Sequence, residues 1–311
     1  MTRNSRIPAH ADAKMAIAEK AISTSDKFNH TFSDVPLVKI FANTKPHRAL
    51  VTDINRNLAA TLKASGPSLI SSSVTLKAVT ETLIAVITKS HPCQKDFGLD
   101  EDFGALEEIS EYDWLTIDTA MDTICGLALS LGPSFSQLWK MFEKTLMKYA
   151  SGSEGFERAT AVGVISECIK GMEDAVTPYT STLLPLLLKR LTDEDPETKS
   201  NAAYAVGLLQ QHSQDEDAIL KQFSAILGRL EPLLQTSEAR AKDNAAGCVA
   251  RMIMRHPTHV PISQVVPALL ELLPLEDDFD ENEPVWNMIV GLCKPLPLPS
   301  PSRHLSEEKA Y

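Results

Sequence analysis

Residues 199–207, KSNAAYAVG, and residues 242–250, KDNAAGCVA, are two versions of one helical segment. A leucine-rich segment with a proline precedes each of them, LPLLL in the first case and EPLL in the second, and a short polar turn lies between. The two versions begin 43 residues apart, and a related segment, RATAVG at 158–163, begins 41 residues before the first. A period of roughly 40–47 residues with two helices per unit is typical of HEAT and armadillo repeats. The sequence therefore predicts an all-α fold, an α-solenoid built as a superhelix of antiparallel helix pairs.

The rest of the chain can be aligned with this repeat. Apolar residues spaced three and four apart predict one helix at 47–64 and then five pairs: 72–90 with 113–131, 135–149 with 156–172, 178–191 with 196–211, 219–234 with 239–255, and 261–273 with 283–293. We therefore expect three parts: a poorly ordered lead-in at 1–46, a HEAT-repeat solenoid of about six repeats at 47–294, and a disordered, proline-rich tail at 295–311.

Prolines and alanines distinguish the two helices of a pair. Pro185, Pro232 and Pro267 each lie within a first helix, where a proline bends the helix, so we expect curved first helices on the outer side. The second helices have adjacent alanines that permit close packing, and we expect them on the inner, concave side. Thr177 and Asp195 precede prolines and are predicted to cap helices.

The composition argues against several classes of protein. No apolar stretch reaches the 18 or so residues of a membrane span, and no secretory signal precedes the first helix. The five cysteines are far apart and are predicted to be reduced thiols of an intracellular protein. No phosphate-loop, dinucleotide-binding or nucleophile-elbow motif occurs. His256 and His259 make a weak metal site, and His91 near Cys93 fits a helix end better than a catalytic pair. We therefore predict no enzyme activity, no cofactor and no metal.

Acidic residues are concentrated in two segments that we interpret as loops. The net charge is −11, and the segments 96–113 and 276–283 together hold fourteen acidic residues and no basic one. Such segments repel nucleic acids and attract basic proteins, although a solvated loop that only aids solubility has the same composition. We expect the first of them to be an insertion between two helices of a repeat, with these acids: Asp96, Asp100, Glu101, Asp102, Glu107, Glu108, Glu111 and Asp113.

A candidate cargo-binding surface follows from repeated positions on the second helices. Asn201 and Asn244 are equivalent in the repeat, and an amide there can hydrogen-bond an extended peptide. Carboxylates beside them and an aromatic ring one repeat earlier would suit a lysine side chain. Helix capping and solvated faces are the alternative interpretation of the same residues. The predicted cargo-binding residues are Tyr149, Glu197, Asn201, Glu238, Asp243 and Asn244.

Three segments resemble a known family. DNAAGCVARM at 243–252, PALLELLPL at 267–275 and the acidic turn after Pro92 and Cys93 are similar to the C-terminal repeats of importin-β-type karyopherins, within them the importin-4 branch. The resemblance covers about 48–293. It implies the C-terminal, cargo-binding part of a nuclear import receptor, which carries histones and ribosomal proteins, contacts nucleoporins and moves between cytoplasm and nucleus.

The resemblance also sets limits. Family members have many more repeats and bind RanGTP through amino-terminal ones, so we expect RanGTP binding of the full-length family and not of this chain. Exposed apolar ends are expected where neighbouring repeats are missing. A HEAT-repeat scaffold of a cytosolic complex, or a truncated fragment without transport activity, remains the alternative. Neither nucleic acid nor a membrane is an expected partner.

Overall fold

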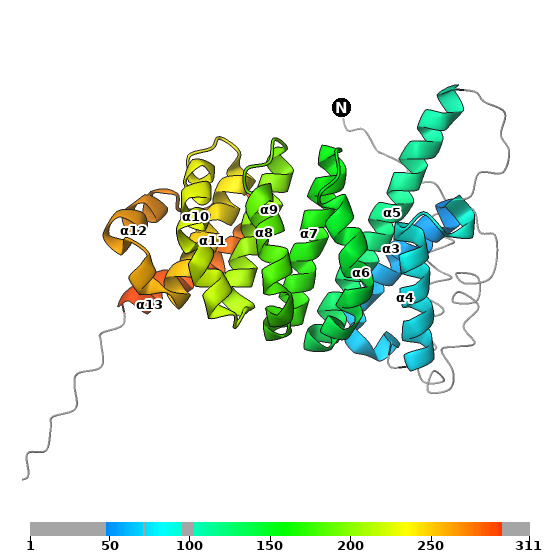
Figure 1. The fold of residues 1–311 in the computed structure, drawn as a ribbon, viewed down its shortest axis with the longest axis horizontal. Helices are drawn as coiled ribbons and strands as arrows, with labels where there is room; N and C mark the ends of the chain where they lie inside the picture. The colour runs from blue at the N-terminus through cyan, green and yellow to red at the C-terminus, as the bar shows by residue number, and fades with distance from the viewer. Residues whose placement is uncertain (1–47, 71, 95–102, 294–311) are drawn as a thin grey trace, which may run out of the picture. The chain divides into compact units, whose positions relative to one another are not determined.

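A computed structural model describes residues 48–70, 72–94 and 103–293 (Figure 1). The chain divides into two compact units, unit 1 at Met1–Val176 and unit 2 at Thr177–Tyr311. All regular structure in the described ranges is helical, which confirms the all-α prediction. No helix among these residues has the length and apolar character needed to cross a membrane. The predicted lead-in at 1–46 and the predicted tail at 295–311 lie outside the described residues.

Unit 1 has two layers of helices. The helix α5 packs between α3 and α7 in one layer, while α4 and α6 pair with α5 and α7 from the other. The predicted pairing is therefore present. The helices of unit 1 are α3 (Arg48–Ser65), α4 (Ser73–Ile87), α5 (Phe103–Leu131), α6 (Ser136–Tyr149) and α7 (Gly155–Met172).

A polar seam joins α3 to α5. The Thr52 and Thr116 hydroxyls lie 3.1 Å apart, and the Thr123 hydroxyl donates to the Asn55 carbonyl at 3.0 Å. Further along, the Ser130 hydroxyl donates to the carbonyl of Leu62 at 2.7 Å. The partners advance together along both helices, so α3 and α5 run parallel. These side chains are buried or half-buried, and their mutual hydrogen bonds offset the cost of removing them from water.

Aromatic residues of α6 and the turn before it fill the core of unit 1. Trp139, Phe135 and Phe142 are fully buried, and the two phenylalanine rings stack with centroids 6.2 Å apart. Within the layer of α3, α5 and α7, the helix α7 approaches α5 closely at Gly171. A Cβ atom added at Gly171 would collide with the Ala128 carbonyl. Glycine there permits the close contact that a solenoid layer needs.

Unit 2 repeats the arrangement. The helix α11 packs between α9 and α13, while α8 and α10 pair with α9 and α11. Hydrogen bonds join the first half of α11 to the first half of α9, from Asn244 to Ser200, and the later parts of the two helices, from Arg251 to Gln211 and from Arg255 to Gln210, so these helices also run parallel. The helices of unit 2 are α8 (Thr180–Arg190), α9 (Pro196–His212), α10 (Glu216–Leu234), α11 (Ala239–Arg255), α12 (Ile262–Glu271) and α13 (Asn282–Cys293).

Small residues allow α9 and α11 to pack closely in unit 2. Ala202, Ala203, Ala245 and Ala246 are all buried, on the two helices for which the sequence predicts close contact. The three repeated prolines lie inside α8, α10 and α12, as predicted.

The two predicted caps have different outcomes. Asp195 has an extended backbone and accepts a hydrogen bond from the Thr198 N–H at 2.6 Å, so it caps α9 as predicted. The prediction for Thr177 is wrong, because a 3-10 turn at Glu173–Tyr179 includes it and α8 begins only at Thr180. The Thr177 hydroxyl instead accepts from the Gln214 N–H at 3.0 Å and so ties the start of unit 2 to the turn after α9.

Candidate binding surfaces

Asp243 lies inside unit 2, where it holds the connection between α12 and α13. Its side chain is only 1% exposed. Its Oδ2 accepts hydrogen bonds from three consecutive backbone N–H groups, those of Glu276, Asp277 and Asp278, at 3.1, 2.8 and 2.9 Å. Three convergent donors are well suited to a carboxylate. The interpretation of Asp243 as a surface contact for cargo does not fit this placement, because its carboxylate is used internally.

Asn244 is buried as well. It is 1% exposed, and its Nδ2 donates to the Ser200 Oγ of α9 at 3.0 Å. The amide fixes the register of two parallel helices rather than facing a groove. The equivalence of Asn244 and Asn201 in the sequence therefore does not extend to exposure, since Asn201 is half-buried.

A buried ion pair completes this part of unit 2. Arg251 Nη2 donates to Glu281 Oε1 at 2.9 Å, and Arg251 Nε donates to Gln211 Oε1 of α9 at 3.0 Å. The pair raises the pKa of Arg251 against the opposing effect of burial, which is the largest single influence. A Cβ at Gly247 would collide with the Glu281 carboxylate, so glycine makes room for the pair. The second acidic segment is thus not a simple solvated loop.

Glu197 and Glu238 are exposed, as a contact surface requires. Glu197 lies in the first turn of α9 and Glu238 at the amino-terminal cap position of α11. Because α9 and α11 run parallel, both carboxylates lie at the same end of the layer. Glu238 makes no side-chain capping bond, so the alternative capping role is not supported for it. Tyr149 belongs to unit 1 and the other predicted residues to unit 2.

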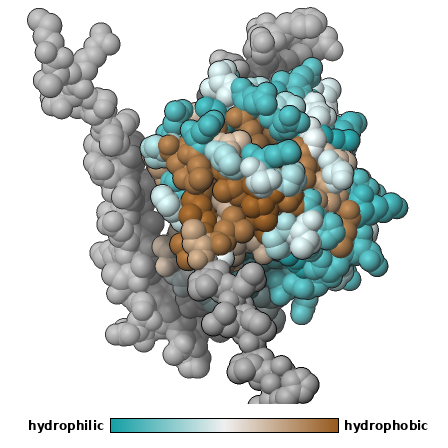
Figure 2. All heavy atoms as spheres, turned by 90° about the vertical axis from the view of Figure 1, so that its left-hand side faces the viewer, coloured by the Kyte–Doolittle hydropathy of each residue, from teal (hydrophilic) through white to brown (hydrophobic). Residues whose placement is uncertain are grey.

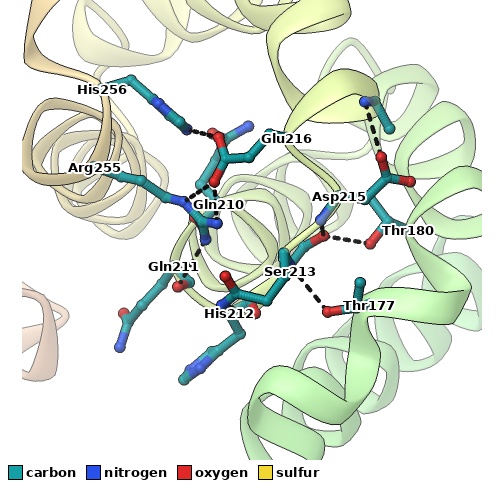
Figure 3. Close-up of polar contacts among 12 residues, drawn as sticks. Thr177, Thr180, Gln210, Gln211, His212, Ser213, Asp215, Glu216, Arg255 and His256 are labelled. Atoms are coloured by element: carbon teal, nitrogen blue, oxygen red, sulfur yellow. Dashed lines mark hydrogen bonds and ion pairs between the residues drawn. The ribbon is translucent and has the colours of Figure 1, made fainter.

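Polar contacts fasten the turn between α9 and α10 (Figure 3). Arg255 donates to the Gln210 and Gln211 carbonyls at 3.0 and 3.1 Å and to the Glu216 carboxylate. The Thr180 and Ser213 hydroxyls lie 2.6 Å apart. The hydrogen bonds from Arg255 lower the pKa of Glu216. These groups form hydrogen bonds with one another, so we assign them a structural role.

Unit 1 has an aromatic cluster that the sequence analysis found only in part. The cluster consists of Trp114 of α5, Tyr149 at the end of α6 and Phe156 in the first turn of α7. The Trp114 ring meets those of Tyr149 and Phe156 edge to face, with centroids 5.8 and 5.1 Å apart. Phe156 is 52% exposed, which is unusual for a phenylalanine in a helical repeat. The aromatic cluster therefore offers ring surface to the solvent.

Carboxylates lie near the aromatic cluster. Burial, together with the negative charges of Glu157 and Asp113, raises the pKa of Tyr149 to about 12. The Tyr149 hydroxyl donates to the Ile87 carbonyl at 2.9 Å, which orients the ring. Asp113 forms an ion pair with Arg48 at 2.8 Å. The cluster thus combines ring faces with the carboxylate of Glu157 and the ion pair of Asp113 with Arg48.

Half of the predicted acidic loop can be compared with the structure. Asp96, Asp100, Glu101 and Asp102 lie outside the described residues, but α5 begins at Phe103 and includes Glu107, Glu108, Glu111 and Asp113. Figure 1 shows the first turns of α5 projecting beyond the other helices of unit 1. The prediction of a loop is wrong for this half, because alanine, leucine and glutamate favour a helix.

The sequence contained only weak indications that Trp114 and Phe156 belong to a candidate site. Trp114 directly follows the acidic segment, and Phe156 precedes the apolar positions that α7 buries, Ala159 and Val162. The indication that the sequence offered was an aromatic residue at a position outside the set of apolar positions that its helix buries. Only the tertiary structure brings the three rings together.

The described residues offer little for catalysis or metal binding. The His91 Nδ1 lies 3.0 Å from the Cys93 Sγ, but burial raises the pKa of Cys93 to about 11, so this thiol stays protonated at neutral pH. The His256 and His259 rings pack against Phe223. In these ranges no group of three or more potential ligands could hold a metal ion.

Comparisons with known sequences agree with the repeats. A family model described as IPO5-like, TPR repeats matches residues 119–272. The probable importin subunit beta-4 of Schizosaccharomyces pombe is 36% identical over 222 residues, which are 69% of this chain and 21% of that protein. Importin-4 of Homo sapiens is 32% identical over 251 residues, 79% of this chain and 23% of that protein. The chain therefore spans about a fifth to a quarter of the length of these relatives.

Solved structures share the fold. The karyopherin Kap121p bound to the SUMO protease Ulp1p has a TM-score of 0.64 at 15% identity, covering 84% of this chain and 24% of Kap121p. Kap121p bound to RanGTP also has a TM-score of 0.64, at 14% identity, covering 82% and 23%. The relatives are named importins and not enzymes, which confirms the prediction of no enzyme activity. With its solenoid fold and these similarities, the chain belongs to the importin-β-type karyopherins and is similar to their importin-4 branch.

Proposed function

We propose that this chain is the cargo-binding part of a nuclear import receptor, and that the aromatic cluster of unit 1 binds lysine side chains of basic cargo such as histones and ribosomal proteins. Family membership supports the transport role. The cluster supports the basic cargo. A role in both cytoplasm and nucleus, with contacts to nucleoporins, follows from the same family and is part of the proposal.

The observation that carries the proposal is the exposed Phe156 ring beside Trp114, with the carboxylates of Asp113 and Glu157 nearby. A lysine ammonium over an aromatic face is attracted by the ring and gains about 0.5–2 kcal/mol, depending on its exposure. The methylene stem of the lysine can cover the ring while the ammonium reaches the carboxylates.

Long-range attraction would bring the cargo to the cluster. The acidic residues of the segment 96–113 precede Trp114 directly in the sequence, and those from Phe103 on lie on α5. A strongly negative segment accelerates association with a basic partner, and salt screens the effect. The ring contacts would instead slow dissociation.

Unit 2 adds a second surface to the proposal. Glu197, Asn201 and Glu238 are exposed or half-buried at the amino-terminal side of α9 and α11. We keep these three as candidate contacts for an extended basic segment. Asp243 and Asn244 are left out because both are buried and hydrogen-bonded internally.

The test is the binding of a fluorescent lysine-rich peptide to the whole chain, measured by anisotropy. Phe156→Ser should weaken binding about threefold to tenfold because the exposed ring surface is lost. Phe156→Tyr should keep most of the affinity. Met141→Ser, which removes another exposed apolar side chain of unit 1, is the matched control and should change little.

Two results would contradict the proposal. One is equal affinity of Phe156→Ser and Met141→Ser, which would make the aromatic cluster an ordinary surface. The other is equal affinity for a glutamate-rich peptide of the same length, which would exclude charge recognition. Replacement of Glu107, Glu108 and Glu111 by Gln should lower the association rate mainly, and stopped-flow mixing at low and high salt measures this.

A further inference from the structure

The outward face of α6 is positively charged, although the chain as a whole is negative. One side of α6 is apolar and buried in the core of unit 1. The exposed residues of α6 lie on the opposite side, and they are Gln137, Lys140, Met141, Lys144 and Lys148. We call the three lysines among them, Lys140, Lys144 and Lys148, the lysine row. The face that α6 exposes therefore has no acidic residue, in a chain whose net charge is −11.

The other first helices do not share this arrangement. Each of α4, α8, α10 and α12 has at most one exposed lysine or arginine. In α4 that lysine, Lys77, pairs with Glu81 at 3.8 Å, whereas no member of the lysine row forms an ion pair with any residue that the structure describes. The helix dipole favours a cation in the last turn, which accounts for Lys148 only. The one acidic residue of α6, Glu143, is half-buried.

The lysine row lies within the repeat array. Figure 2 shows apolar side chains gathered at the end formed by α12 and α13, where the described residues stop. A repeat array uses such a surface to stack the next repeat. The helix α6, by contrast, already packs against α4 and α7. The exposure of the lysine row therefore does not depend on where the described residues stop.

The spacing of the lysine row matches that of an extended peptide. Residues four apart on a helix are separated by about 6 Å along its axis, so the row spans about 12 Å. In an extended chain every second side chain lies on the same face, and such side chains recur about every 6.4–6.8 Å. Carboxylates at alternate positions would therefore meet the three lysines one after another. The long lysine side chains can take up the remaining difference in spacing and direction.

From this geometry we propose that the lysine row binds an extended, acidic segment of a partner protein, with aspartate or glutamate at alternate positions. A nucleic acid fits less well, because the exposed face of α6 has neither an aromatic side chain to stack on bases nor an arginine to hold phosphates. A membrane surface also fits less well, since the apolar side of α6 is buried. The proposal concerns a different surface and does not rest on the cargo site of the proposed function.

The test titrates the isotope-labelled whole chain with a nine-residue peptide of threonine and three glutamates, placed two apart, and follows the backbone amides by nuclear magnetic resonance. At about 0.1 M salt, charges more than about 10 Å away are largely screened, so acids elsewhere in the chain oppose binding little. The shifts should concentrate on α6. Lys140→Gln, Lys144→Gln and Lys148→Gln together should weaken binding about fivefold or more, because three ion pairs are lost.

A matched variant separates the lysine row from total charge. Lys77→Gln, Lys189→Gln and Lys221→Gln remove exposed lysines from three other helices and change the net charge equally, so this variant should keep the affinity within about twofold. Glutamine is a good helix former, and circular dichroism of both triple variants should match that of the original chain. Phe156→Ser should not change the affinity for the glutamate peptide, so failure of this proposal and failure of the cargo site are distinguishable.

A second peptide of equal composition, with its three glutamates four apart, tests the extended geometry. Its carboxylates recur about every 13 Å and can meet only the two ends of the row, so it should bind about twofold to fivefold less tightly. Equal affinity of the two peptides would remove the match of spacing. A glutamate peptide that shifts no amide of α6 would leave the lysine row a solvated helix face.

Three further outcomes would overturn the inference. Equal weakening by the two triple variants would mean that the peptide senses net charge and not the row. Tighter binding of an oligothymidylate or of anionic vesicles, lost on substitution of the row, would identify a nucleic acid or a membrane as the occupant. Sedimentation velocity that finds a dimer, dissociated by the same substitutions, would identify a second copy of this chain.

Discussion

The aromatic cluster of unit 1 and the segment 243–251 of unit 2 differ in how far their functional groups are available to a partner. In unit 2, Asp243, Asn244 and Arg251 are buried, and their hydrogen bonds are made within the protein. In unit 1, the rings of the aromatic cluster remain partly exposed next to carboxylates. In unit 2 these polar residues fasten neighbouring helices to one another, whereas in unit 1 the exposed Phe156 ring is available to a ligand.

The comparison has a physical basis. A polar side chain on a helix that packs between two neighbours can serve as an interhelical hydrogen-bond partner, as Asn244 of α11 does with Ser200 of α9. A binding site needs exposed groups, and the exposed Phe156 ring of unit 1 provides one. Three predictions test this contrast.

The largest effect is expected from Arg251→Met. This change leaves the Glu281 carboxylate buried without its partner and should destabilise unit 2 by about 3–5 kcal/mol. Urea unfolding followed by circular dichroism measures the loss. The double variant Arg251→Met, Glu281→Met should regain much of it, because no buried charge then remains. Arg240→Met, at an exposed pair, is the control. A small effect of Arg251→Met alone would mean that the pair is not fastening the repeats.

A smaller effect is expected from Asp243→Ala. The three backbone N–H groups of the connection after α12 lose their shared acceptor, and the cost should be about 1.5–3 kcal/mol. Urea unfolding reports the stability, and hydrogen exchange at Glu276, Asp277 and Asp278 should accelerate. Asp277→Ala removes an exposed carboxylate close by and should have little effect. If Asp243→Ala instead weakened only peptide binding, with unchanged stability, the residue would belong to a binding surface after all.

The smallest effect is expected from Tyr149→Phe, which removes one hydrogen bond in unit 1 and should cost about 0.5–1.5 kcal/mol. The pKa of Tyr149 is raised to about 12 in the folded chain, above the value of about 10 for an exposed tyrosine. Its contribution is therefore complete below pH 10 and is lost as the pH rises through 12. The stability difference between the original chain and Tyr149→Phe should shrink over that range in alkaline urea titrations. A difference independent of pH would contradict the burial of this hydroxyl.

Much of the fold could be predicted because it depends on local patterns. The period set by 199–207 and 242–250 and the prolines of the first helices predicted most of the helices and their pairing. The start of α5 was missed because its acidic composition suggested a loop, although its residues are good helix formers. Thr177 was misassigned because a 3-10 turn competes with the cap before Pro178.

By itself, the sequence determined the helical repeat, the family and the two acidic segments, because spacing and composition are properties of the chain alone. Only the tertiary structure decided which polar residues are available to a partner. Asn201 and Asn244 have the same place in the repeat, yet one is half-buried and the other is enclosed by α9. The rings of Trp114, Tyr149 and Phe156 come from three helices and meet only after packing. Exposure depends on what each neighbouring helix covers, and no local pattern contains that information.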